Sequence, residues 1–127
     1  MPIQDQISNA SKYDLEERSA KFGEDMIEFV RSLPSDSVNK ILGNQLIRSA
    51  TSVGANYMEA DAAESKKDFQ HKIALCKKES KESMHWLRMI AKANPQQASR
   101  CRELWREAHE LTLIFSSIIL SSKKSKK

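Results

Sequence analysis

Apolar residues recur at intervals of three and four along most of this chain of 127 residues, which is the spacing of one face of an α-helix. The repeat predicts helices over about residues 14–33 and 37–60, a third from a cap at Ser65 to Asn94, and a fourth from about Pro95–Ala98 to residue 121. Two of the three breaks contain proline, which disfavours the helical conformation of the residue before it. Short connections make neighbouring helices antiparallel, so the sequence predicts an all-α, antiparallel up-down-up-down four-helix bundle.

The whole chain, residues 1–127, is expected to form one domain. Residues 1–12 show no periodicity and are predicted as a loose N-terminal arm, and residues 122–127 as a basic C-terminal tail. The residues expected to face the core, helix by helix, are Leu15, Phe22, Met26, Phe29, Val30, Leu33, Val38, Leu42, Leu46, Ala50, Val53, Tyr57, Phe69, Ile73, Cys76, Ser80, Met84, Leu87, Ala91, Ala98, Cys101, Leu104, Trp105, Ala108, Leu111, Thr112, Phe115, Ile118 and Ile119. The apolar residues that miss these faces include Leu113, Ile114 and Leu120, which crowd one end of the fourth helix and predict a subunit contact there.

A line of polar side chains accompanies the apolar face of the second helix. Its members are Gln45, Arg48, Ser52, Asn56 and Glu59. One interpretation is a helix edge half in water; the other is a set of partners for a neighbouring helix, because a solvated flank usually carries interchangeable lysine and glutamate. The second interpretation predicts that Arg48 and Glu59 reach polar residues of the third helix, with Glu79 or Glu82 as the partner of Arg48.

Composition points to a folded helical protein. Only three glycines and three prolines occur, 30% of residues are charged and 39% are hydrophobic. The longest apolar run, Leu111 to Leu120, is too short to span a bilayer, and the N-terminus lacks a basic region followed by an apolar run. We therefore expect a soluble, cytoplasmic protein with no membrane contact. Charge is uneven: residues 1–64 hold six basic and eleven acidic side chains, and residues 65–127 hold fifteen basic and six acidic ones.

Basic residues gather on one side of the third helix, within about 100° of arc. They are Lys67, Lys77, Lys78, Lys81, Arg88 and Lys92. Asp68, Glu79 and Glu82 fall on the other side, together with Trp86. With Arg102, Arg106 and the terminal lysines, these cations could neutralise the phosphates of RNA or DNA, although ordinary surface lysines would give the same pattern. Because no exposed aromatic platform is expected, such binding would be directed to the backbone and sensitive to salt.

The sequence gives little support for a catalytic site or a metal site. A di-iron bundle needs two Glu-x-x-His pairs on inward faces, and this chain has one, Glu82 and His85, turned away from the apolar face. Cys76 and Cys101 fall on core faces at different heights along the bundle, so we expect buried free thiols. The histidines are scattered and no glycine-rich phosphate loop is present. We expect no cofactor, no metal and no enzymatic activity.

Two stretches resemble a known family. Residues 45–60 are similar to its pattern QLxRSAxSIxxNIxEG, with Tyr57 in place of an aliphatic residue and Ala60 in place of the closing glycine. Residues 78–90 are similar to its pattern KExxExxxWLxxL. The family comprises small four-helix-bundle proteins encoded within intervening sequences of bacterial 23S ribosomal RNA genes. Its structural relatives include the accessory variability proteins of diversity-generating retroelements.

The resemblance implies an up-down bundle that assembles into a ring-shaped homopentamer. In the retroelement relatives the ring is basic, binds nucleic acid and supports a reverse transcriptase. The basic excess of residues 65–127 and the one-sided lysines of the third helix give our leading hypothesis: a non-enzymatic homo-oligomeric bundle that binds RNA or DNA backbones through the third and fourth helices and the tail. It would act as an accessory to ribosomal RNA intervening sequences or to a reverse transcriptase. The alternative is a structural adaptor oligomer that binds no nucleic acid and whose charged flanks pair subunit to subunit.

Overall fold

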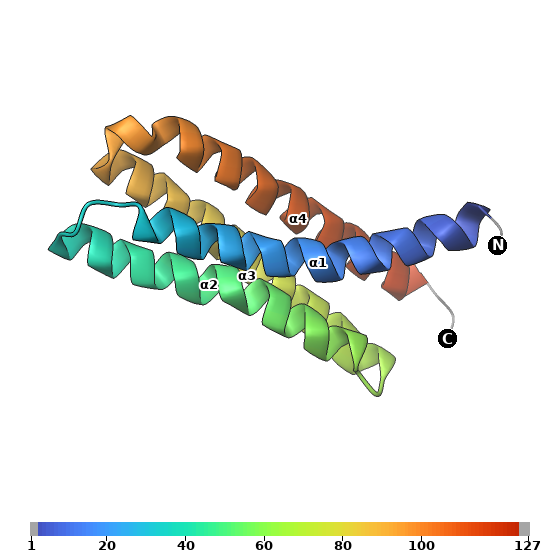
Figure 1. The fold of residues 1–127 in the computed structure, drawn as a ribbon. Helices are drawn as coiled ribbons and strands as arrows, with labels where there is room; N and C mark the ends of the chain where they lie inside the picture. The colour runs from blue at the N-terminus through green and yellow to red at the C-terminus, as the bar shows by residue number, and fades with distance from the viewer. Residues whose placement is uncertain (1–2, 125–127) are drawn as a thin grey trace.

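The computed structural model describes the backbone of residues 3–124 and the side chains of residues 15–124. Within that range the chain folds into four long helices and contains no β-strand. The helices are α1 (Ile3–Arg31), α2 (Ser37–Asp61), α3 (Lys66–Ala93) and α4 (Ala98–Lys124), with a 3₁₀ turn, η1 (Pro95–Gln97), before α4 (Figure 1). The predicted all-α, four-helix fold is confirmed.

Both ends of the chain are more helical than the sequence predicted. α1 begins at Ile3, so the expectation of a loose arm over residues 1–12 is wrong for residues 3–12. No glycine or proline occurs between residue 3 and Gly23, and nothing in that stretch stops the helix from extending toward the N-terminus. α4 runs past the predicted end to Lys124, and the lysines of its last turn favour the negative end of the helix dipole. The rest of the expected tail, residues 125–127, lies outside the described residues.

Side-chain caps begin the two middle helices where the sequence places them. Asp36 precedes α2, and its carboxylate accepts a hydrogen bond of 2.8 Å from the backbone N–H of Asn39. Ser65 precedes α3, and its hydroxyl accepts one of 3.0 Å from the backbone N–H of Asp68. Each cap satisfies one of the four N–H groups that a helix leaves unpaired at its start.

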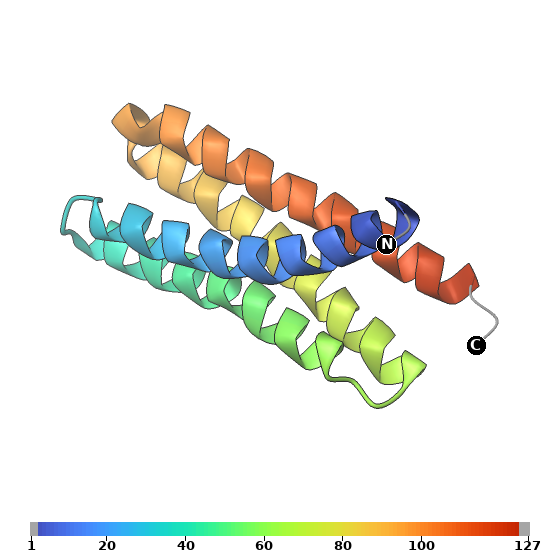
Figure 2. The same ribbon diagram turned by 45° about the vertical axis from the view of Figure 1, so that its right-hand side comes forward.

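The helices form two antiparallel pairs joined through the middle. α1 lies along α2, α4 lies along α3, and α3 packs against both α2 and α4 (Figures 1 and 2). α1 and α4 meet at few positions. The bundle is therefore more open between its first and last helices than an evenly closed four-helix bundle. Arg18 of α1 bridges this seam, with Nε 2.8 Å from Glu107 and Nη2 3.0 Å from Glu110 of α4.

Glycines allow the close packing of α1 on α2. A Cβ atom at Gly43 would lie 2.7 Å from a methyl group of Val30, and one at Gly23 would lie 3.4 Å from the Cα atom of Thr51. The missing side chain at Gly43 therefore makes room for Val30, whereas a Cβ atom at Gly23 would make an ordinary van der Waals contact.

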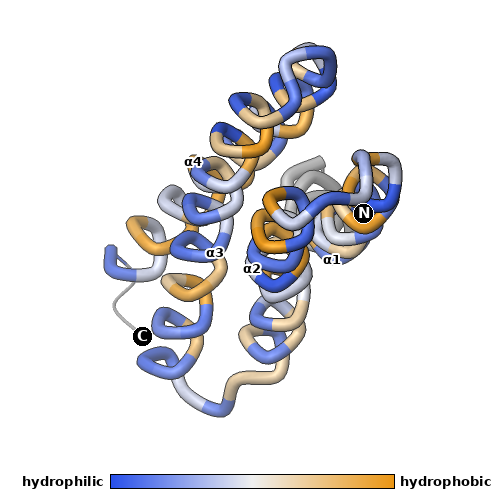
Figure 3. The backbone as a smooth tube through the Cα atoms, turned by 90° about the vertical axis from the view of Figure 1, so that its left-hand side faces the viewer, coloured by the Kyte–Doolittle hydropathy of each residue, from blue (hydrophilic) through white to orange (hydrophobic). Residues whose placement is uncertain are grey.

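The core contains most of the residues expected in it, and polar and apolar segments alternate along each helix (Figure 3). Phe22, Met26, Leu46 and Phe115 are among the largest fully buried side chains. Val38 is wrongly predicted: it is 52% exposed in the first turn of α2, beside the connection from α1. The buried residues of α3 that the core prediction omitted are Ser83 and Ile90. Among the described residues, no helix is long and apolar enough to cross a membrane.

Candidate nucleic-acid interface

The outward side of α3 is lined by basic and imidazole side chains. The exposed residues of this helix are Lys67, His71, Ala74, Lys78, Lys81, His85, Arg88, Lys92 and Ala93. They recur every three or four residues, so those from Lys67 to Lys92 form one line along the helix, which we call the α3 basic strip. Five of the six cations predicted on α3 lie in it, whereas Lys77 is half-buried beside it. None of its side chains is acidic.

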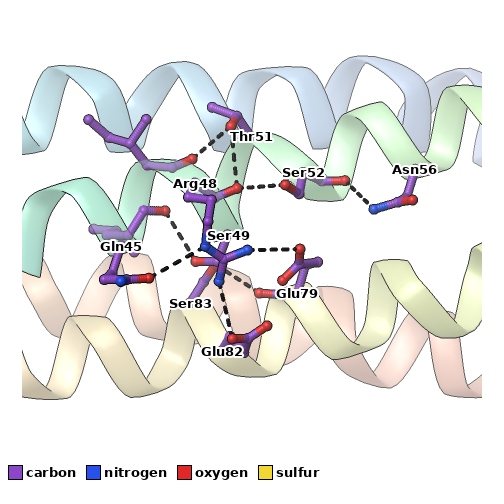
Figure 4. A network of polar contacts seen from close by, with 11 residues as sticks. Gln45, Arg48, Ser49, Thr51, Ser52, Asn56, Glu79, Glu82 and Ser83 are labelled. Carbon is purple, nitrogen blue, oxygen red and sulfur yellow. Dashed lines mark hydrogen bonds and ion pairs between the residues drawn. The ribbon is translucent and has the colours of Figure 1, made fainter.

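The acidic residues of α3 are half-buried and face away from the strip. Arg48 of α2 holds two of them: its Nη1 atom lies 3.3 Å from Glu79 and its Nη2 atom 3.2 Å from Glu82 (Figure 4). Only 13% of the Glu79 side chain is exposed, against 48% of Arg48. The predicted partner of Arg48 is confirmed. The pairing keeps two negative charges on the α2 side of α3, so that the strip carries only positive ones.

The two glutamates share an environment that moves their pKa values in opposite directions. Burial, followed by the hydrogen bond and the charge of Glu82, raises the pKa of Glu79 above its ordinary value. The hydrogen bond from Glu79, aided by the charge of Arg48, lowers the pKa of Glu82. The second carboxylate oxygen of Glu79 is buried with no hydrogen-bond partner among the described residues. The charge of Lys78 adds to that of Arg48 in lowering the pKa of Glu82.

The other residues of the polar line on α2 differ in whether they contact α3 or their own helix. Glu59 reaches α3 as predicted, 3.0 Å from the Nζ atom of Lys72. Ser52 and Asn56 instead donate to backbone carbonyls of their own helix, at 2.6 Å and 2.9 Å. Hydroxyl and amide groups can satisfy themselves on the preceding turn, so their spacing alone does not predict a contact between helices. Gln45 accepts a long hydrogen bond of 3.4 Å from Arg48.

Two buried polar contacts between α2 and α3 have no counterpart in the sequence analysis. The side-chain amides of Asn39 and Asn94 exchange hydrogen bonds of 3.0 Å and 2.8 Å. The hydroxyl groups of Ser49 and Ser83 lie 2.9 Å apart. The sequence analysis used Asn94 only as the end of a helix before proline and gave Asn39 no role, so it did not predict the contact between them.

α4 adds cations to the same half of the molecule. Arg102 and Arg106 are exposed, whereas the glutamates of α4 pair with other arginines: Glu103 with Arg100 at 3.0 Å, and Glu107 and Glu110 with Arg18. The hydrogen bond with Glu107 raises the pKa of Arg18 above its ordinary value. Within the described part of the chain, none of the eight predicted cations forms an ion pair. Their charges remain available to an external anion.

A small hollow is lined by a cation from α3 and a cation from α4. Arg88 of α3 and Arg102 of α4 both line it, and so does Trp105, which the sequence analysis assigned to the core. Trp105 is only half-buried, and its ring stacks on that of His109 with the centroids 5.1 Å apart. Its place three residues after Arg102 is the signal that could have located it beside the basic surface.

Reactive groups are buried or dispersed. Cys76 and Cys101 are both free and buried, as predicted, and burial raises the pKa of the Cys76 thiol to about 12. Among the described side chains, no group of three or more histidine, cysteine, aspartate or glutamate residues could hold a metal ion. The arrangement as a whole offers charge recognition along a rigid helix.

Comparison with known proteins identifies the family. A family model described as 23S rRNA-intervening sequence protein matches residues 11–117. The chain belongs to this family. The resemblance drawn from residues 45–60 and 78–90 is confirmed.

A solved structure agrees with this assignment. It is the crystal structure of a protein with unknown function from the S23 ribosomal protein family of Bacteroides thetaiotaomicron VPI-5482. The two chains are 26% identical, with a TM-score of 0.76 over 85% of this chain and 96% of the other. No curated protein matches this chain.

Proposed function

We propose that this member of the 23S rRNA-intervening sequence protein family is a non-enzymatic cytoplasmic bundle that binds the phosphate backbone of RNA or DNA. The α3 basic strip, half-buried Lys77, and Arg102 and Arg106 of α4 form the binding surface. The observation that carries the proposal is that every exposed side chain of α3 is basic, imidazole or alanine, while Glu79 and Glu82 are held by Arg48 of α2.

The shape of the strip supports contact with several phosphates at once. From Lys67 to Lys92 it follows a single helix for 25 residues, or about 37 Å at 1.5 Å per residue. Each neutralised phosphate releases a condensed counterion, so binding by several lysines is strong at low salt and falls steeply as salt rises.

A matched pair of triple variants tests the proposal. Lys78→Gln/Lys81→Gln/Arg88→Gln removes three charges from the strip, and Lys21→Gln/Arg31→Gln/Lys40→Gln removes three exposed charges from α1 and α2. We expect the first variant to lower affinity for a mixed-sequence RNA duplex and to make the slope of log K against log salt shallower by about 2–3. The second variant should keep the slope. Binding that is absent in the unmodified protein, or unaffected by salt, would refute the proposal.

The same proposal includes self-assembly. The assembled protein would act as an accessory to a ribosomal RNA intervening sequence or to a reverse transcriptase. Exposed apolar residues support self-assembly: Leu113 and Leu120 on α4 are 55% and 60% exposed, and Ile41 on α2 is 64% exposed. Light scattering should give the mass of a homo-oligomer, with a pentamer as the expected size. Leu113→Ser/Leu120→Ser should reduce that mass if α4 provides the contact.

The second candidate function is a structural adaptor whose charged flanks join subunits. The acidic half of the chain favours it, because residues 1–64 carry an excess of negative charge that could pair with the strip of a neighbour. Lys78→Glu/Lys81→Glu distinguishes the two functions. An adaptor loses oligomer mass and never binds RNA, whereas a nucleic-acid-binding protein keeps its mass and loses RNA affinity.

A further inference from the structure

The hollow between the end of α3 and the start of α4 has a volume of about 200 Å³. Apart from its two arginines its lining is apolar, formed by Leu87, Ala91, Ala98, Cys101 and Trp105. Leu87 and Cys101 are buried and Trp105 is half-buried, so the hollow opens at the surface over a packed base. Among the described residues, no acidic side chain lines it.

This combination restricts what the hollow can receive. A volume of about 200 Å³ is smaller than the roughly 300–1,000 Å³ of sites that enclose a drug-sized ligand, so it fits one small flat group. The apolar lining disfavours a charged group inside, whereas Arg88 and Arg102 at its edge favour negative charge immediately outside. An unpaired RNA base has both properties, because a flat ring is attached to a chain of phosphates.

We propose that this hollow binds a single unpaired base of an RNA strand, with Arg88 and Arg102 contacting the phosphates on either side of it. The inference rests on the proposed function, because Arg88 also belongs to the α3 basic strip. A base inside a continuous duplex is stacked and paired and cannot enter, so the strip would bind the paired backbone while the hollow selects a bulge or loop beside it.

A second copy of the chain fits the hollow less well. A subunit contact would bury Arg88 and Arg102 and would need acidic partners for both, since an unpaired buried charge is strongly destabilising. The strongly exposed apolar residues that would serve such a contact, Ile41, Leu113 and Leu120, do not line the hollow.

Two RNA hairpins of equal length test the inference, one fully paired and one with a single-nucleotide bulge. We expect the unmodified protein to bind the bulged hairpin at least about fivefold more tightly, the lower end of what one stacked base contributes. Ala98→Leu fills the hollow without changing charge and should abolish this preference while leaving affinity for the paired hairpin unchanged. Ala74→Leu places the same extra atoms on the strip at a distance from the hollow and should keep the preference.

Tryptophan emission gives an independent measurement. In Trp86→Phe, where Trp105 is the remaining tryptophan, the bulged hairpin should change the emission more than the paired one does. Equal affinities for the two hairpins, or a preference that survives Ala98→Leu, would overturn the inference and leave the proposed function standing. A change of oligomer mass in Ala98→Leu would assign the hollow to a subunit contact and also overturn it. Failure of the unmodified protein to bind either hairpin would refute the proposed function itself.

Discussion

The two long sides of α3 carry opposite kinds of charged residue and use them differently. Toward α2, Glu79 and Glu82 are held by Arg48, and the amide of Asn94 is paired with that of Asn39. Toward solvent, the cations of the α3 basic strip form no ion pair with a described residue. The first side joins two helices and the second is left for an external partner. Substitutions on the two sides should therefore affect different measurements.

The largest loss of stability is expected at the buried end of the α2-facing side. Asn94→Ala removes both hydrogen bonds with Asn39 and leaves the buried side-chain oxygen of Asn39 without the donor that Asn94 supplies. We expect the free energy of unfolding to fall by about 2–3 kcal/mol, measured by urea denaturation. Asn39→Ala/Asn94→Ala should cost less than the sum of the two single substitutions, because neither side-chain amide is then left without the other. Additive losses would show that the two amides do not act together.

A smaller loss of stability is expected where Arg48 pairs with Glu79 and Glu82. Arg48→Ala leaves Glu79 beside Glu82 without a cation, and we expect it to destabilise the protein by about 1–2 kcal/mol, since the arginine is partly solvated. The substitution also returns uncompensated negative charge to the neighbourhood of the strip, so RNA affinity at low salt should fall. Arg48→Ala/Glu79→Gln should recover part of both losses. Unchanged stability in Arg48→Ala would show that the cluster does not join α2 to α3.

A still smaller change, of opposite sign, is expected for Glu79→Gln. Because the folded-state pKa of Glu79 is raised, the folded state favours its protonated form, and this contribution is lost as pH rises through the folded-state value. Glutamine keeps the hydrogen bonds without the charge, so we expect a gain of about 0.5–1 kcal/mol at pH 7. The gain should shrink as pH falls and Glu79 itself becomes protonated. Denaturation at several pH values measures it, and a gain that does not change with pH would contradict the assigned cause.

The smallest effect on stability is expected on the strip. Lys81→Gln should change the free energy of unfolding by less than about 0.5 kcal/mol, since its side chain is exposed and forms no ion pair with a described residue. The same variant should weaken RNA binding and reduce the salt slope by about 0.7–0.9. A clear loss of stability without loss of binding would contradict the assignment of the strip to binding rather than to stability.

Much of this molecule is determined by local features of its sequence. The spacing of apolar residues gives four helices, and caps such as Asp36 and Ser65 locate their starts within a residue or two. The arc that separates lysines from glutamates on α3 follows from helical geometry alone, because residues three and four apart share a face. Even the contact from Arg48 to Glu79 and Glu82 could be predicted, since an arginine in a line of polar residues on a core-facing helix needs a partner there.

The tertiary structure decided which of those faces meet. The sequence could not show that, within the described residues, α1 and α4 meet at few positions, because each helix shows only its own apolar face. Nor could it show that Asn39 meets Asn94, or that Trp105, partly buried against the core, also lines a hollow with Arg88 and Arg102. Periodicity records the direction of a side chain around its own helix. The distance to a neighbouring helix is set by the packing of all the side chains between them, and no single helix contains that information.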